Sequence, residues 1–160
     1  SIKLEGRAKS HYYTAAVTNA YRMTLDSIDV NNLHNWCLPD AAADELNKIS
    51  HRVYSTGFYF GPPENSQTYE NAGYVRDYAV AAIVLGYEDG LIVCEMKNKF
   101  ALGAEFDCLE PRKAPFTFKV EEMFDEKGDS IDVAPHPTMI VKIPFEREVA
   151  VGSLLRMKSE

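Results

Sequence analysis

His51 and Arg52 are adjacent residues whose side chains often bind ligands or take part in catalysis. A histidine can act as acid, base or metal ligand near neutral pH, and an arginine can hold an anion through two parallel hydrogen bonds. Both residues also follow a segment of helical character, where basic side chains interact favourably with the last carbonyls and with the helix dipole. We therefore treat His51 and Arg52 as substrate-binding candidates. The alternative is that they only stabilise the end of the helix.

The stretch SHRVYSTGFYFGPP, residues 50–63, adds four aromatic side chains around this basic pair. Exposed aromatic rings could stack on RNA bases. The alternation of Tyr54, Thr56 and Phe58 fits a strand with one buried face equally well, and buried rings are the commoner case. We expect the four rings to be packed at a junction within the chain: Tyr54, Phe58, Tyr59 and Phe60.

Recognised catalytic and metal-binding motifs are missing from the sequence. His34, Cys37 and His51 could be assembled into a metal site, but one HxxC pair with a distant histidine is a weak signal. There is no GxSxG elbow, no HExxH pair and no phosphate-binding glycine loop. The three cysteines are far apart, which indicates reduced, partly buried thiols. We assign no metal, no cofactor and no catalytic residue to this segment.

The net charge of −7 argues against the broad basic surface of an autonomous nucleic-acid-binding protein. A local basic patch could still contact nucleic acid or a protein partner, and its candidates are Lys97, Lys99, Arg112 and Lys113. The sequence has neither an apolar run long enough to cross a membrane nor the layout of a signal peptide. We expect a cytoplasmic protein with no membrane partner.

Helical periodicity dominates the first half of the chain. Ser10 is a suitable N-cap, and the apolar residues after it recur at steps of three and four, which predicts a helix over residues 11–27. Pro39 and the acidic residues that follow predict the start of a second helix. The buried edge of this second helix would consist of Ala42, Leu46 and Ile49.

After Asp77 the pattern changes to short β-rich segments separated by turns. We expect strands at residues 78–87, 91–96, 105–110, 116–124, 130–134, 139–145 and 153–157. Gly103 and Gly152 each precede one of these strands, where a positive φ or a bulge gives the sharp entry that small barrels use. The predicted fold class is α+β, with a helical segment at residues 1–76 and an antiparallel β-barrel at residues 77–160.

Five separated motifs carry a resemblance that covers nearly the whole chain: IKLEGRAKSHYYTAAVTNAYRMTLD, KISHRVYSTGFYFG, NKFALGAEFDCLEP, APHPTMIVKIPF and VGSLLR. In this order they resemble the C-terminal end of peptidase family U32, the collagenase-like proteases. The resemblance implies that residues 1–76 are the end of a TIM-type catalytic barrel, with IKLEG as its last strand. Residues 77–160 would be the family's C-terminal β-barrel, which is similar to the second domain of elongation factors. The rest of the catalytic barrel would precede Ser1.

This resemblance adds Glu5 and Arg7 to the substrate-binding candidates. Both would lie at the C-terminal end of the last barrel strand, the edge where such barrels collect their catalytic residues. Arg7 could bind a carboxylate or a phosphate there. The alternative is an ordinary ion pair between Glu5 and Arg7.

The resemblance also carries an expectation about function. Characterised relatives include enzymes that hydroxylate tRNA or ribosomal RNA and others credited with proteolysis. Since the family's cysteine signature lies upstream of the matched region, we expect an accessory domain that positions an RNA or peptide substrate and is not catalytic in isolation. Two alternatives stay open: an autonomous collagenase-like peptidase, and a structural domain that covers the missing barrel or mediates self-association. A full-length enzyme could also hold a metal.

Overall fold

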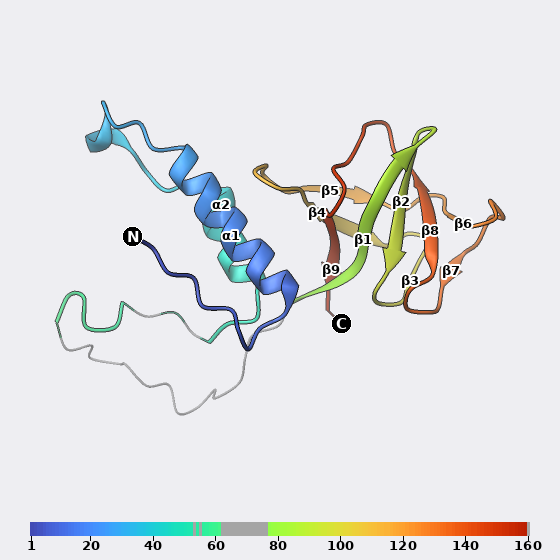
Figure 1. The fold of residues 1–160 in the computed structure, drawn as a ribbon, viewed down its shortest axis with the longest axis horizontal. Coiled ribbons are helices and arrows are strands. Elements are labelled where there is room, and N and C mark those ends of the chain that lie inside the picture. Colours follow the sequence, from blue (N-terminus) through green and yellow to red (C-terminus); the bar gives the residue numbers. More distant parts are fainter. Residues whose placement is uncertain (53, 55, 62–76, 160) are drawn as a thin grey trace.

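The fold combines a pair of helices with a curled β-sheet (Figure 1). The computed structural model describes residues 1–52, 54, 56–61 and 77–159. The helical part consists of α1 (His11–Asp26), a short 3-10 turn η1 (Leu33–Asn35) and α2 (Asp40–Lys48). The two α-helices lie side by side on one flank of the sheet. The predicted α+β class is therefore confirmed.

Local sequence explains where both helices begin. The Oγ of Ser10 accepts a hydrogen bond from the backbone N–H of Tyr13 at 3.2 Å, as an N-cap does. α2 starts directly after Pro39, and Asp40 in its first turn and Lys48 in its last turn complement the helix dipole. Both predicted helices are confirmed.

The described residues after position 76 form nine short strands. These are β1 (Tyr78–Glu88), β2 (Leu91–Met96), β3 (Phe100–Ala101), β4 (Glu105–Leu109), β5 (Phe116–Lys119), β6 (Phe124–Asp125), β7 (Val133–Ala134), β8 (Ile140–Pro144) and β9 (Leu154–Lys158). Seven of them make one antiparallel sheet in the order β5-β4-β9-β1-β2-β8-β6, and β3 pairs with β7. Register shifts between Val80 and Ala82 and between Val84 and Gly86 interrupt the long strand β1 and help the sheet to curl.

Side-chain alternation gives β4 and β9 two different faces. Phe106, Cys108 and Leu155 point into the main core of the β domain. Leu109 and Leu154 belong to a second apolar cluster that includes residues of the helical segment. The helices therefore pack on the face of the sheet that is turned away from the main core.

The two predicted glycine entries are present. Gly103 and Gly152 have φ values of 84° and 85°, in the left-handed region that disfavours residues with a Cβ. Gly103 precedes β4 by two residues, and Gly152 precedes β9 by two residues. Both predictions are confirmed.

Two strand predictions are wrong. Residues 2–6 form no strand, because backbone pairing needs a neighbouring strand and the described residues place none beside them. The strand predicted over residues 116–124 divides into β5 and β6. After β5, Val120 bonds to the entry of β4, donating its N–H to the oxygen of Ala104 and accepting the N–H of Gly103. The two-residue strand β3 was too short to show an alternating pattern.

The predicted packing of the aromatic residues is also wrong. Tyr54 is 54% exposed, and Phe58, Tyr59 and Phe60 are 79–85% exposed. Instead of entering a core, Tyr54 stacks on His51 with ring centroids 4.4 Å apart, and Tyr59 contacts the edge of Phe60. The end of this stretch, Pro62 and Pro63, lies outside the described residues.

The burial expected of the cysteines is found for two of the three. All three thiols are free, with Cys37 exposed and Cys94 and Cys108 buried. Burial raises the pKa of Cys94 and of Cys108 to about 12. As for membranes, the helices in the described part of the chain are all too short or too polar to cross one.

Candidate functional site

A groove with a volume of about 960 Å³ opens on the helix-bearing face of the sheet. Its walls come from β1, β4, β9 and the segment between β2 and β4. The residues that matter for its chemistry are Lys99, Gly103, Glu105, Asp107, Arg156 and Lys158. We call this the lysine groove, because Lys99 and Lys158 line it and Lys119 borders it, with its Cε 3.7 Å from where a Cβ on Gly103 would lie.

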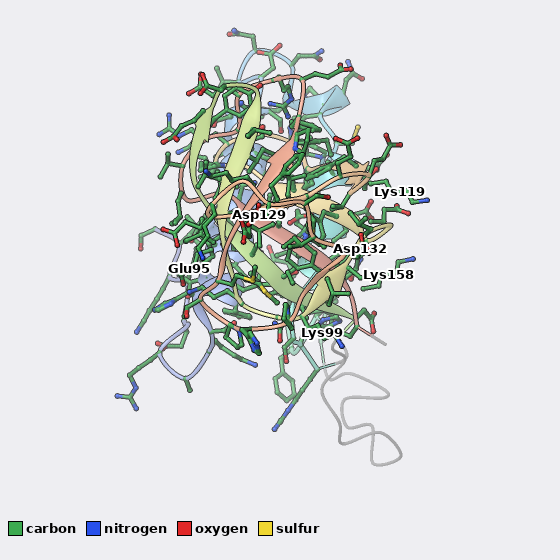
Figure 2. The ribbon with its side chains drawn as sticks, turned by 90° about the vertical axis from the view of Figure 1, so that its right-hand side faces the viewer. Glu95, Lys99, Lys119, Asp129, Asp132 and Lys158 are labelled. Carbon is green, nitrogen blue, oxygen red and sulfur yellow. The ribbon has the colours of Figure 1, made fainter. Side chains whose placement is uncertain are left out.

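Strand register explains why these side chains meet. Lys119 on β5 is opposite Glu105 on β4, and Lys158 on β9 is opposite Tyr78 on β1. Because alternate residues share a face, Glu105 and Lys158 follow Asp107 and Arg156 on one surface of neighbouring strands. Figure 2 shows Lys119 and Lys158 along one edge of the domain, with Asp132 beside them in this view and Lys99 below them.

A buried ionic cluster lies where this face of the sheet meets α2. Arg156 is fully buried, and its guanidinium donates both Nη groups to the carboxylate of Glu45, one of them at 2.7 Å. The Nη2 of Arg156 also donates to Asp107 Oδ2 at 3.1 Å. This paired geometry joins a helix residue to a strand residue 111 positions later in the chain.

Lys48 and Tyr12 complete the cluster. Lys48 donates its Nζ to Asp107 Oδ2 at 2.7 Å and lies 3.3 Å from Glu45. The hydroxyl of Tyr12 donates to the backbone oxygen of Lys48 at 2.9 Å and accepts from Arg156 at 3.2 Å. The ionic cluster of Glu45, Lys48, Asp107 and Arg156 therefore contains two cations and two carboxylates, which compensate each other.

The pKa shifts in this cluster favour a structural role. Burial raises the pKa of Tyr12 to about 12, so its hydroxyl stays protonated. Burial alone would lower the pKa of Arg156, but the hydrogen bonds and charge of Glu45 outweigh it and the pKa rises. The pKa of Lys48 is also raised, because the hydrogen bond and charge of Asp107 overcome burial. Neither cation can serve as a base near neutral pH.

The four cations predicted as a patch do not meet at one place. Lys99 lines the lysine groove, whereas Lys97 is held in an ion pair with Glu95. Arg112 and Lys113 belong to the turn between β4 and β5, and Lys113 bonds to Glu110 at 3.1 Å. The structure thus divides the candidates between two regions.

The candidates in the helical segment lie apart from this groove. Glu5 accepts the backbone N–H of Arg7 at 3.2 Å, so the contact recorded between them involves no guanidinium. His51 makes a hydrogen bond between its Nδ1 and the backbone oxygen of Ile49 at 2.7 Å, close to the end of α2. Arg52 follows it in the chain and is exposed. Within the described residues, no three His, Cys, Asp or Glu side chains are placed to hold a metal ion.

Sequence reasoning missed Glu45, Asp107, Lys119, Arg156 and Lys158. A signal existed for Glu45, since it lies three residues after Ala42 and four before Ile49, on the predicted buried edge of α2. A charged residue on such an edge indicates a buried partner. Nothing local pointed to Arg156 as that partner.

The geometry describes an α+β protein with a groove on its β domain. Comparison with known protein families finds two matches. Residues 76–156 match the peptidase family U32 C-terminal domain, and residues 1–69 match peptidase family U32. The chain therefore belongs to peptidase family U32. The resemblance inferred from the sequence motifs is confirmed.

Relatives of this chain are named for tRNA hydroxylation. The chain is 29% identical over 159 residues to tRNA hydroxylation protein P1 of Bacillus subtilis, covering 98% of this chain and 37% of that protein. It is 27% identical to tRNA hydroxylation protein P of Escherichia coli, covering 99% of this chain and 35% of that one. The chain thus spans about a third of the length of these curated relatives.

A solved structure is similar to part of the chain. It is the C-terminal domain of a protein described as a U32 peptidase from Geobacillus thermoleovorans, with 32% sequence identity and a TM-score of 0.47. The match covers 49% of this chain and 98% of that one.

Proposed function

We propose that this chain is an accessory, substrate-positioning part of an RNA-hydroxylating U32 enzyme and that its lysine groove contacts the RNA backbone. The observation that carries the proposal is the gathering of Lys99, Lys119 and Lys158 at one groove in a chain with a net charge of −7. The names of the relatives, which specify tRNA, support RNA as the substrate class.

The electrostatics of the groove suit phosphate contacts that position an RNA without reading its sequence. Flexible lysines at a rim neutralise phosphates and release counterions, which gives affinity that depends on salt. Glu105 lies among them and moderates the positive charge. The affinity of this groove alone for RNA should therefore be modest. A modest affinity is sufficient for a contact that assists a separate catalytic site.

A tRNA-binding assay tests the proposal. Replacing Lys99, Lys119 and Lys158 by Gln should weaken binding of labelled tRNA roughly tenfold or more, and should reduce the slope of log K against log salt by about 2 to 3. The matched control replaces three other lysines by Gln, namely Lys3, Lys127 and Lys142, and should retain most of the affinity. Equal losses in both triple variants would reject the groove as the RNA contact.

We further propose that the rest of a U32 domain covers the helical segment. Fifteen large hydrophobic side chains are exposed in the part of the chain that the structure describes, and eleven of them lie before position 62, among them Ile2, Leu25, Val30, Leu33, Leu38 and Phe58. Exposed apolar surface of this kind marks a contact site, and the relatives are longer than this chain. Hydrogen exchange in residues 2–38 should slow when the chain is linked to the rest of a U32 domain. Unchanged exchange would contradict this contact.

A further inference from the structure

A second groove, with a volume of about 590 Å³, lies between α1 and the β domain. The residues that define its chemistry are Ala15, Asn19, Arg22, Leu109, Arg112 and Leu154. We call it the arginine groove. Along β4 its lining starts at Leu109, whereas the lining of the lysine groove includes Glu105 and Asp107, and the two grooves share no lining residue among those described.

One wall of the arginine groove is held in a strained conformation. Arg112 has a φ of 64°, in the left-handed region where a glycine would cost less. The side chain of Asn19, which is buried on α1, holds this turn through two hydrogen bonds. Its Oδ1 accepts the N–H of Arg112 at 2.6 Å, and its Nδ2 donates to the backbone oxygen of Lys113 at 3.2 Å. The backbone at Arg112 is thus held in place at a position where a glycine would be favoured.

The surroundings of this groove are positively charged. Arg22 lines it with a buried Nε that has no hydrogen-bond partner among the described residues, while its Nη2 pairs with Asp26. The buried carboxylate of Glu110 is already bonded by Lys113 and Arg147. The lining residues and their direct ion-pair partners therefore comprise four cations against two carboxylates.

The groove also has an apolar floor beside these cations. Leu109 and Leu154 form the floor, and Ala15 contributes a small side chain from α1. A volume of this size falls in the usual range for sites that hold a small organic ligand. An apolar floor that accepts a ring, next to arginines that accept a phosphate, is the chemistry that recognises a nucleotide.

We propose that the arginine groove binds one unstacked nucleotide of the RNA, with its base on Leu109 and Leu154 and its phosphate held by Arg112 and Arg22. This inference rests on the proposed function, because it takes RNA as the substrate class. It differs from the backbone contact at the lysine groove, since it places a base as well as a phosphate.

Isotope-labelled chain titrated with AMP, GMP, CMP and UMP tests the proposal by NMR. The amides of Asn19, Arg112 and Gly152 should shift with at least one nucleotide, and inorganic phosphate should bind at least tenfold more weakly. If phosphate binds as tightly as every nucleotide, the site recognises only an anion and the proposal fails. If none of these ligands shifts the three amides, the proposal fails as well.

Replacing Arg112 by Gly tests the phosphate contact without disturbing the fold, because glycine adopts the positive φ without strain. R112G should weaken nucleotide binding tenfold or more. Two controls should bind as the parent does: D89G, which relieves a positive φ at 50° in the turn between β1 and β2, and K127Q, which removes a cation elsewhere. Equal affinity of R112G and the parent would overturn the assignment.

These outcomes are separable from those of the tRNA assay. The lysine triple variant tests backbone binding and leaves the arginine groove intact. Nucleotide shifts that persist in that variant and vanish in R112G support the arginine groove even if the lysine groove proves unimportant. Nucleotide shifts lost in the lysine variant but kept in R112G would place the nucleotide in the lysine groove and reject this proposal.

Discussion

At the scale of single residues, Arg156 joins the helices to the sheet through its buried bonds to Glu45. It has no exposed surface, and its partner Glu45 has none either. Its Nε and the Oδ1 of Asp107 have no partner among the described residues, so the cluster is satisfied in charge but not in every hydrogen bond. Removing one partner leaves the others buried without compensation, which is costlier than removing a pair.

We predict that Arg156→Met lowers the free energy of unfolding by about 3–5 kcal/mol, because Glu45 loses its bidentate cation. Urea denaturation followed by circular dichroism measures this loss. Lys158→Met, two residues further on the same face of β9 but exposed, is the matched control and should change stability by less than about 0.5 kcal/mol. Adding Glu45→Leu to Arg156→Met should restore part of the loss, and a further large loss would contradict the mechanism.

Glu110 should make stability depend on pH. Burial alone would raise its pKa, but hydrogen bonds from the N–H of Ala150, from Arg147 and from Lys113 outweigh burial and lower it. A carboxyl group whose pKa is lower when folded stabilises the fold above its unfolded pKa, and this contribution disappears as pH falls through the lowered value.

We therefore predict that the chain loses stability as the pH falls below about 5 and that Glu110→Gln flattens this part of the curve. Urea midpoints measured at several pH values provide the test. The exposed residue Glu105, changed to Gln, serves as the control and should leave the pH dependence close to that of the parent chain. A Glu110→Gln curve as steep as the parent's would show that other groups carry the effect.

At the scale of elements, the entries to β4 and β9 depend on turns that only glycine forms without strain. Among the described residues, no heavy atom outside its immediate neighbours lies within 4 Å of a Cβ built on Gly152, so a substitution there would change backbone conformation and not packing. This position therefore isolates the cost of a positive φ.

Gly152→Ala should destabilise the fold by about 1 kcal/mol, since alanine must adopt a φ of 85°. The change appears as a lower thermal or urea midpoint. Gly86 in β1 is a suitable comparison, because its φ is not positive and a Cβ would meet only the Glu88 carboxylate at 3.9 Å. If Gly86→Ala proved as costly as Gly152→Ala, positive φ would not be the cause.

At the scale of the whole molecule, the helices and the β domain share buried groups and should unfold together. Glu45 and Lys48 from α2 meet Asp107 and Arg156 from the sheet, and Asn19 from α1 holds the turn at Arg112. Neither part alone supplies all the hydrogen-bond and charge partners of these groups. Separating the two parts would therefore expose these groups to solvent or leave them without partners.

Thiol reactivity reports on this joint unfolding. In the native chain near pH 8, only the exposed Cys37 should react quickly with a disulfide reagent, because burial and a pKa of about 12 keep Cys94 and Cys108 protonated. Cys94 and Cys108 should become reactive at the same urea concentration at which the helical signal is lost. Reaction of either buried thiol well before that point would contradict joint unfolding.

Local sequence patterns were sufficient for much of this fold. The cap at Ser10, the start after Pro39 and the glycines before β4 and β9 all follow from neighbouring residues, and so does the family, whose motifs are contiguous. These features could be predicted because propensity, periodicity and turn chemistry act over a few residues.

Tertiary structure alone decided which distant residues meet. Glu45 and Arg156 are 111 positions apart in the sequence, and they pair only because α2 docks on β9. The predicted basic patch divided in the same way, with Lys99 in one groove and Arg112 in the other, while strand register brought Lys119 and Lys158 to the first. Such contacts depend on register and docking, which no local pattern encodes.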